Sequence, residues 1–179
     1  EDAAHAFGTT YQNKRIGEFG DISCFSFDGI KNITAGEGGC IVTDNEVVLQ
    51  RVRDARLLGI QGDTEKRYAS ARSWAFDVTD SGWRYHMSNV MAAIGIEQLK
   101  RFDEIANKRR ELAECYVTHL EGSTSIKLIK HDYREVVPHI FVVHLPSGVS
   151  RERVIAALNE LNIQTGIHYK PNHQHALFR

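Results

Sequence analysis

The sequence predicts an α/β protein followed by a small α+β unit. In its first two thirds, strand-like runs alternate with segments of helical periodicity. After Gly122 the order becomes strand, strand, helix and strand, which is typical of α+β architecture. The 179 residues, 42% hydrophobic and 25% charged, suffice for one good core or for parts of two domains.

Two strands are predicted around a glycine-rich loop. Residues 21–27 (DISCFSF) alternate apolar and small side chains, and residues 39–43 (GCIVT) form a short β-branched run. The loop between them carries several glycines and one lysine, Lys31. A lysine at a strand edge is usually only a solvated charge that discourages edge pairing. The rest of the chain must therefore decide what Lys31 does.

Helices are predicted next. Asp44 is a good N-cap for a helix that we expect to end near Gly59. Residues 61–80 lack periodicity, and a loop of this length inside a compact domain is often functional or disordered. Ser88 caps a further helix, or broken helix, of roughly 30 residues that we expect to bridge two domains.

The α+β unit is predicted from four segments. Strands are expected at residues 125–130 and 136–145, a helix at 150–162 and a strand at 163–169. The helix has apolar residues on one face, as expected for packing against a sheet. No internal repeat accompanies them.

Composition excludes several classes of partner. The net charge of −1 provides no basic field for nucleic acid or a membrane surface, and no apolar run approaches the roughly 20 residues that span a bilayer. Cys24, Cys40 and Cys115 are odd in number and lack Cys-x-x-Cys spacing, so neither a disulfide framework nor a metal site is indicated. A reducing cytoplasm fits best. The first residues show no signal peptide and suggest a chain cut from something longer.

Lys31 has neighbours in the sequence that suit carbonyl chemistry. A buried lysine with a lowered pKa is a nucleophile for carbonyl groups, and its best-known partner is pyridoxal phosphate. This cofactor needs an acid at its pyridine nitrogen and donors for its phosphate. Asp2 lies 29 positions before Lys31 and Ser26 five before it, so both kinds of group are present. Spacing alone does not decide the matter.

Four segments carry a family resemblance. They are EDAAHAFG at 1–8, GDISCFSFDGIKNITAGEGGCIVT at 20–43, YHMSNVMAAIGIEQLKR at 85–101 and HYKPNH at 168–173. In this order they resemble the DegT/DnrJ/EryC1/StrS family of pyridoxal-phosphate-dependent sugar aminotransferases. The serine, the lysine and the Gly-Glu-Gly-Gly block at their proper distances are the strongest signal. The resemblance covers essentially the whole chain.

The resemblance implies a domain organisation. Residues 1–105 would be the C-terminal part of the large domain of a fold type I pyridoxal-phosphate-dependent transferase. Residues 106–179 would be a small, incomplete α+β C-terminal domain. Because family members are longer, we expect the chain to be truncated at the N-terminus and at the C-terminus as well. The missing part would hold the family's phosphate-binding helix N-terminus.

The resemblance also implies roles for residues that hold the cofactor. Lys31 matches the Schiff-base lysine, which also serves as general base and acid. Asp2 matches the partner of the pyridine nitrogen, and His5 the residue that packs against or hydrogen-bonds the O3′ side of the cofactor. Ser26 matches a phosphate ligand. The simpler alternatives are a surface carboxylate for Asp2, a structural imidazole for His5 and local backbone satisfaction for Ser26.

One segment departs from the family pattern. Many members carry Asn-Tyr-Arg-Met where this chain has Arg84 followed by Tyr85, His86 and Met87. Arg84 thus takes the place of an asparagine that reaches across a homodimer to the partner's cofactor phosphate. Arginine is a competent phosphate ligand, although an ordinary solvated charge is the alternative.

His168, Tyr169 and His173 match the stretch that borders the family's substrate pocket. The two histidines lack the further partner that a metal site would need. The implied reaction transfers an amino group from glutamate to a nucleotide-linked keto sugar. Two alternatives remain: an inactive or binding-only remnant, and a sugar dehydratase that uses pyridoxamine phosphate. Lys31 speaks against the dehydratase, because dehydratase relatives carry a histidine there.

Overall fold

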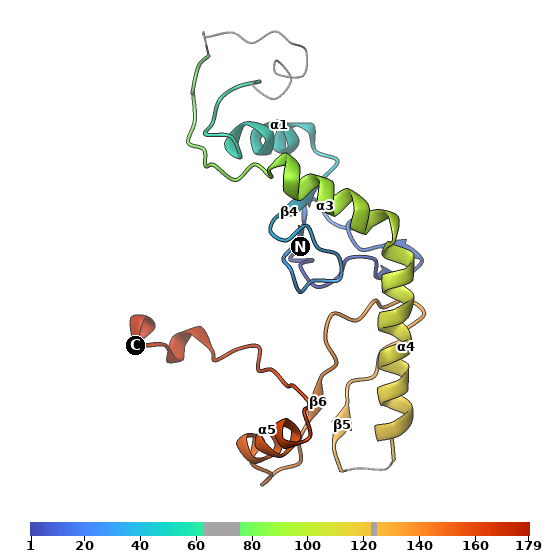
Figure 1. The fold of residues 1–179 in the computed structure, drawn as a ribbon. Helices are drawn as coiled ribbons and strands as arrows, with labels where there is room; N and C mark the ends of the chain where they lie inside the picture. Colours follow the sequence, from blue (N-terminus) through green and yellow to red (C-terminus); the bar gives the residue numbers. More distant parts are fainter. Residues whose placement is uncertain (63–75, 123–124) are drawn as a thin grey trace. The chain divides into compact units, whose positions relative to one another are not determined.

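The computed structural model describes residues 1–62, 76–122 and 125–179. It divides into two compact units, one of Glu1–Thr118 with Lys130–Phe141 and one of His119–Ile129 with Val142–Arg179 (Figure 1). The described residues contain both helices and short strands, but four strands precede the first helices and the predicted alternation is absent. The domain boundary expected after residue 105 stays a prediction. What the sequence did not indicate is that Lys130–Phe141 returns to the first unit.

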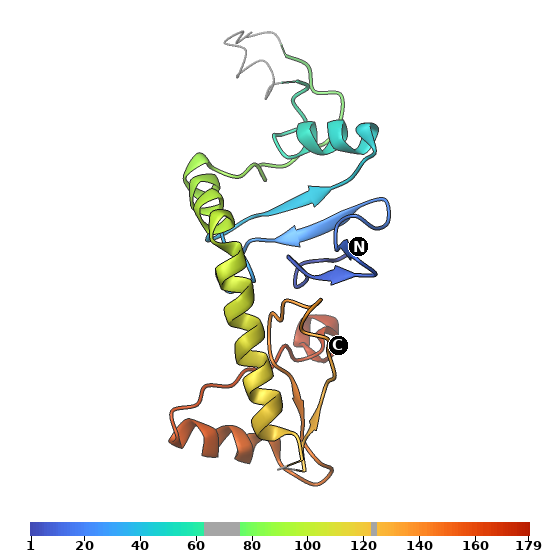
Figure 2. The ribbon, with the colours of Figure 1, turned by 90° about the vertical axis from the view of Figure 1, so that its right-hand side faces the viewer.

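The first unit contains the two predicted strands. β3 (Ser23–Ser26) pairs antiparallel with β4 (Gly39–Val42), and Figure 2 shows the two arrows side by side. Phe25 is buried while Cys24 is exposed, which is the alternation expected of a strand with one covered face. A smaller pair, β1 (Thr10–Tyr11) with β2 (Lys14–Arg15), precedes them.

The helix α1 (Glu46–Ala55) begins and ends differently from the prediction. Its N-cap is Asn45 and not Asp44, because the Asn45 Oδ1 accepts hydrogen bonds from the amides of Val47 at 3.0 Å and Val48 at 3.2 Å. It ends at Ala55, four residues before Gly59. The amide of Trp83 donates to the Ala55 carbonyl at 2.6 Å. A residue outside the helix thus satisfies the carbonyl of the last helical residue.

The predicted helix after Ser88, which the sequence left open as continuous or broken, is broken in two. α3 (Asn89–Lys100) starts at the Ser88 cap, whose Oγ accepts from the Met91 amide at 3.3 Å. Arg101 leaves the helical region at φ −109° and ψ 16°, and α4 (Phe102–Leu120) follows in a new direction. None of the helices in the described parts combines the length and the apolar character needed to cross a bilayer.

The core of the first unit is built around Phe7. Its ring makes edge contacts with the rings of Phe25, Phe27 and Phe102, with centroids 5.6, 6.0 and 4.9 Å apart. Val137, on the returning segment, is 1% exposed. The core thus joins the first residues of the chain, β3, the start of α4 and the returning segment.

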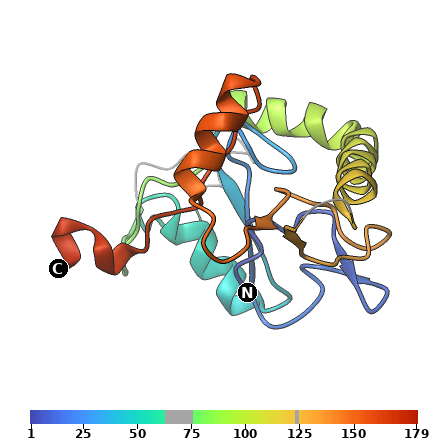
Figure 3. The same cartoon turned by 90° about the horizontal axis from the view of Figure 1, so that it is seen from below.

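The second unit is the smaller one, and none of its described residues is buried. β5 (Lys127–Leu128) pairs antiparallel with β6 (Val143–His144). The helix α5 (Arg151–Glu160) follows, with Ser150 as its N-cap (Figure 3). Two 3₁₀ turns, η1 (Asn172–Gln174) and η2 (Ala176–Phe178), end the chain.

Two predictions for the second unit need correction, and one for the first unit falls partly outside the residues that the structure describes. Both strands are much shorter than expected, because only two residues of each find a partner. The strand expected at 163–169 is wrong: this described segment pairs with no other strand, and Ile163 and Ile167 stay exposed. Of the predicted 61–80 loop, residues 63–75 lie outside the described residues.

Candidate active site around Lys31

Lys31 is presented by a tight turn that follows β3. Its amide donates to the Asp28 carbonyl at 3.0 Å, and the Asp28 carboxylate accepts from the Ile30 amide at 3.2 Å. The loop then folds back, since the Ala35 amide donates to the Phe27 carbonyl at 2.8 Å. Lys31 itself is half-buried. These contacts fix the backbone from which its amine extends.

The Lys31 amine meets a second predicted site residue. Its Nζ lies 2.9 Å from the Nε2 of His5, so the structure brings together two residues that are 26 positions apart in the sequence. An imidazole at this distance can exchange a proton with an amine or hold it in one orientation. The Lys31–His5 contact is the centre of the candidate site.

Asp2 and Ser26 lie on neighbouring segments. The Ala3 amide donates to the Cys24 carbonyl and the Cys24 amide to the Glu1 carbonyl, both at 2.9 Å, so residues 1–3 run parallel to β3 through a single bridge between Asp2 and Cys24. Ser26 is the last residue of β3, and His5 and Lys31 follow these two segments in the chain. Ligand sites in open α/β sheets lie beyond the carboxyl ends of the strands.

The Asp2 and Ser26 side chains have local partners. The exposed carboxylate of Asp2 accepts from the Ala4 amide at 3.1 Å, and the Ser26 Oγ accepts from the Asp28 amide at 3.3 Å. The second contact is the local backbone satisfaction that the sequence left open as an alternative. Neither contact uses all the acceptor capacity of its side chain.

The glycines of the Gly-Glu-Gly-Gly block allow close packing. A Cβ on Gly38 would lie 2.5 Å from the Cε of Met87, and one on Gly39 would collide with the Phe25 carbonyl on β3. Gly38 also has φ +130°, which residues with side chains rarely adopt. Gly38, at the end of the loop after Lys31, therefore lies against the residues that lead into α3, and Gly39 lets β4 lie close to β3.

Two residues near Lys31 escaped the sequence analysis. The His139 ring lies on the His5 ring, with centroids 4.1 Å apart, and the Arg109 guanidinium donates to the Lys31 carbonyl at 3.2 Å. Burial lowers the pKa of Arg109 below its ordinary value. Only the return of Lys130–Phe141 brings His139 here, and no spacing in the sequence signals that return.

Asn32 anchors the same region. It is 2% exposed, and its Nδ2 donates to the carbonyls of Phe7 at 3.3 Å and Val137 at 3.0 Å. The returning segment is thus tied to the residue after Lys31 and to the one two places after His5. The Asn32 Oδ1 is buried and has no hydrogen-bond partner among the described residues.

The remaining predicted residues lie elsewhere. Arg84 pairs through its backbone with Leu57, beyond the end of α1, and its side chain is exposed. His168, Tyr169 and His173 belong to the second unit and are exposed. Their roles in the site stay predictions.

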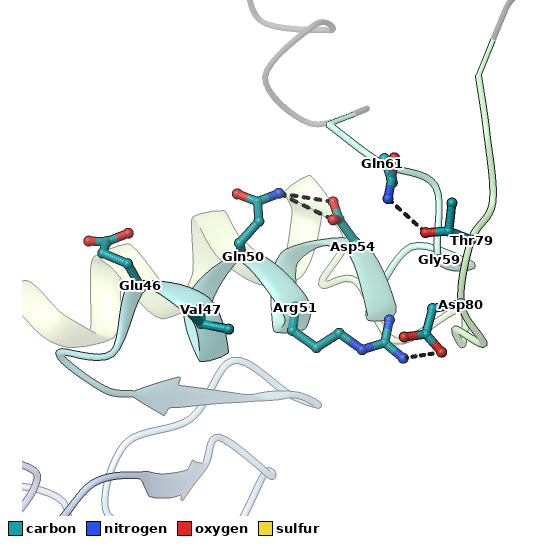
Figure 4. Close-up of a pocket in the computed structure, with 9 residues that line it drawn as sticks. All are labelled: Glu46, Val47, Gln50, Arg51, Asp54, Gly59, Gln61, Thr79 and Asp80. Atoms are coloured by element: carbon teal, nitrogen blue, oxygen red, sulfur yellow. Dashed lines mark hydrogen bonds and ion pairs between the residues drawn. The ribbon is translucent and has the colours of Figure 1, made fainter.

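A hollow of about 470 Å³ lies beside α1, and none of the predicted site residues lines it (Figure 4). Its polar side chains are largely paired with one another. Gln50 donates to Asp54 at 3.1 Å, Gln61 donates to Thr79 at 2.7 Å, and Arg51 forms an ion pair with Asp80 at 3.0 Å. Its lining includes no lysine amine, so the carbonyl chemistry points to Lys31.

The sequence model of the DegT/DnrJ/EryC1/StrS aminotransferase family matches residues 1–179. The chain is 37% identical over 184 residues to the Bacillus subtilis spore coat polysaccharide biosynthesis protein SpsC, covering 100% of this chain and 47% of SpsC. The chain therefore spans about half the length of the curated relatives it matches.

Solved structures give the same result. The chain is similar to Helicobacter pylori PseC, an aminotransferase involved in pseudoaminic acid biosynthesis, with a TM-score of 0.86, 26% identity and coverage of 99% of this chain and 46% of PseC. Streptococcus pneumoniae Spr1654, also 26% identical, has been solved in a PMP-form with a TM-score of 0.86 and in a PLP-form with 0.82. The PMP-form match covers 99% of this chain and 46% of Spr1654.

These matches extend over both compact units, and the structural ones cover nearly every residue of the chain. The expected fold class is thereby confirmed in part, as a portion of the fold of such aminotransferases. The chain belongs to the DegT/DnrJ/EryC1/StrS aminotransferase family.

Proposed function

We propose that this chain supplies the lysine-bearing part of a pyridoxal-phosphate-dependent aminotransferase that moves an amino group from glutamate to a nucleotide-linked keto sugar. The observation that carries the proposal is the contact between the Lys31 amine and His5, which joins the loop after β3 to the first residues of the chain. Family membership supports the reaction class. The roles of SpsC in spore coat polysaccharide biosynthesis and of PseC in pseudoaminic acid biosynthesis support a sugar substrate.

The residues present fit the cofactor by their chemistry. When bound, pyridoxal phosphate supplies an aldehyde that captures amines and a protonated ring that accepts an electron pair. Lys31 offers the amine, and the exposed Asp2 carboxylate suits the ring nitrogen. The Ser26 hydroxyl keeps donor capacity for a phosphate oxygen, and Arg84 would serve a phosphate by its planar fork of donors.

Proton movement is assigned to the Lys31–His5 pair. Lys31 binds the cofactor and, once released, carries a proton between the substrate carbon and the cofactor. His5 holds the amine in place and would hydrogen-bond or pack against the O3′ side of the cofactor, as the family resemblance implies. We assign His168, Tyr169 and His173 to the substrate side of the pocket. Two half-reactions, first with glutamate and then with the keto sugar, complete the cycle.

We further propose a cytoplasmic homodimer in which Arg84 reaches the partner's cofactor phosphate. The odd number and scattered spacing of the cysteines fit a reducing compartment. In a two-fold assembly the same patch is used by both subunits. Light scattering coupled to size exclusion tests pairing: a mass near 20.2 kDa at every concentration would rule it out for this chain.

The half-reaction with glutamate tests the proposed function. The chain, loaded with pyridoxal phosphate, should convert glutamate to 2-oxoglutarate, and Asp2→Asn should lower the rate far more than it lowers cofactor binding, because an amide does not keep the ring nitrogen protonated. Absence of 2-oxoglutarate from a chain that retains cofactor would favour the binding-only alternative. Release of water from the sugar without amino transfer would favour the dehydratase.

A further inference from the structure

Arg109, on α4, holds three backbone carbonyls with one side chain. Its Nη2 donates to the Lys31 carbonyl at 3.2 Å, and its Nη1 donates to the carbonyls of Pro138 at 3.4 Å and His139 at 3.2 Å. Lys31 and His139 are far apart in the sequence, and the guanidinium joins them directly. The group is half-buried, so these bonds are partly shielded from water.

The carbonyls of Lys31 and His139 belong to residues whose side chains converge on the same imidazole. The Lys31 Nζ lies 2.9 Å from the His5 Nε2, and the centroid of the His139 ring lies 4.1 Å from that of the His5 ring. Fixing the backbone of Lys31 and that of His139 therefore fixes both neighbours of His5. No other described side chain donates to the carbonyls of both residues.

We propose that Arg109 is a positioning residue for the Lys31 amine, acting through the Lys31 carbonyl and through the His139 backbone that supports His5. The inference rests on the proposed function only in taking Lys31 as the reactive amine. A guanidinium suits this task because its donors point in fixed directions, so it bridges several carbonyls at once. The ammonium group of a lysine at the same place would satisfy fewer of these carbonyls, and it would not fix their orientations relative to one another.

The competing explanation is that Arg109 only stabilises the fold. Arg110 provides a matched control, since it lies next on the same helix and donates to the Val136 carbonyl at 3.4 Å and to Asn107 at 3.3 Å. It therefore ties α4 to the same returning segment without touching Lys31. Both Arg109→Gln and Arg110→Gln should lower the melting temperature.

The two variants should differ at His5. In the 179-residue chain, the ¹⁵N shift of the His5 Nε2 in Arg109→Gln should move toward its value in Lys31→Ala, whereas Arg110→Gln should keep the wild-type shift. Labelling by pyridoxal phosphate and borohydride, mapped by mass spectrometry, should show the ratio of Lys31 to Lys14 adducts falling about three- to tenfold in Arg109→Gln, the range that loss of one ordinary hydrogen bond allows.

A wild-type His5 shift and a wild-type labelling ratio in Arg109→Gln would overturn the proposal and leave Arg109 a structural residue. If Arg109→Gln fails to fold, Arg109→Lys is measured in the same way, and recovery of the wild-type His5 shift by a single ammonium would contradict the role of the planar fork. The His5 shift needs no cofactor. Absence of any adduct on Lys31 in the wild type would therefore count against the proposed function while the shift still decides the role of Arg109.

Discussion

The two compact units differ in how they are held together. Every buried residue among those described lies in the first unit, and the described part of the second unit contains none. The first unit is closed by contacts across more than 100 positions, such as the Asn32 hydrogen bond to the Val137 carbonyl. In the second unit, large apolar side chains such as Leu161 at 69% and Leu177 at 85% stay exposed.

This difference separates the candidate site into two parts. The amine-bearing part, the half-buried Lys31 with the exposed His5, is held through its backbone: Arg109 joins the Lys31 carbonyl to the returning segment, and the neighbouring Asn32 is buried and hydrogen-bonds to the Val137 carbonyl. The substrate-side residues His168, Tyr169 and His173 lie on exposed chain, so no packing fixes their side chains. The structure thus preorganises the group expected to react with the cofactor.

The largest expected effect compares two glycines. In Gly39→Ala the new methyl group collides with the backbone carbonyl of Phe25, which cannot move without breaking the β3–β4 pair, so we expect a loss of about 3 kcal/mol in unfolding free energy. Gly148, in the second unit, has φ +84° but nothing within 4 Å, so Gly148→Ala should cost about 1 kcal/mol. Urea denaturation measures both. Equal losses of unfolding free energy in the two variants would contradict the difference in packing between the units.

A core substitution sharpens the comparison. Val137→Ala removes two methyl groups from a side chain that is 1% exposed and should destabilise the protein by about 2 kcal/mol. Leu161→Ala removes a larger group from a site that is 69% exposed and should change stability by less than about 0.5 kcal/mol. The same denaturation experiment compares them, and a greater loss for Leu161→Ala would show that the second unit is packed in solution.

The smallest effect concerns two carboxylates. Hydrogen bonds from Arg134 lower the pKa of Asp132, in the first unit, to about 2, whereas in the second unit backbone and Ser150 hydrogen bonds lower the pKa of Glu152. A pKa lowered by folding adds stability above the ordinary value of 3.8, and Asp132 loses this contribution as the pH falls toward about 2. Arg134→Gln should raise the pKa of Asp132 toward 3.8 and leave Glu152 unchanged, as followed by carboxyl ¹³C shifts. A common shift of both would show coupling between the units.

Local signals predicted much of the fold. The alternation in residues 21–27, the Ser88 cap and the helix of 150–162 correspond to β3, α3 and α5. The failures occurred where pairing decides the structure: residues 163–169 have strand-like composition but no partner strand among the described residues. Composition indicates that a segment can pair, and only topology supplies the neighbour.

The candidate site was predictable only in part. The resemblance singled out Lys31 and His5 separately, and the structure adds the contact between them. His139 and Arg109 were missed because their role depends on where Lys130–Phe141 returns, which leaves no periodic signal in the sequence. Supporting residues of this kind follow from packing, whereas the reactive amine follows from its motif.

The central claim, that Lys31 is the reactive amine of a preorganised site, has a direct test. The chain is treated with pyridoxal phosphate, reduced with borohydride and digested, and the pyridoxyl group is located by mass spectrometry. We predict that it lies on Lys31, that Lys31→Ala abolishes it, and that Lys14→Ala, which changes an exposed lysine of the same unit, leaves it intact. A dominant adduct on any other lysine of the wild-type chain would contradict the account.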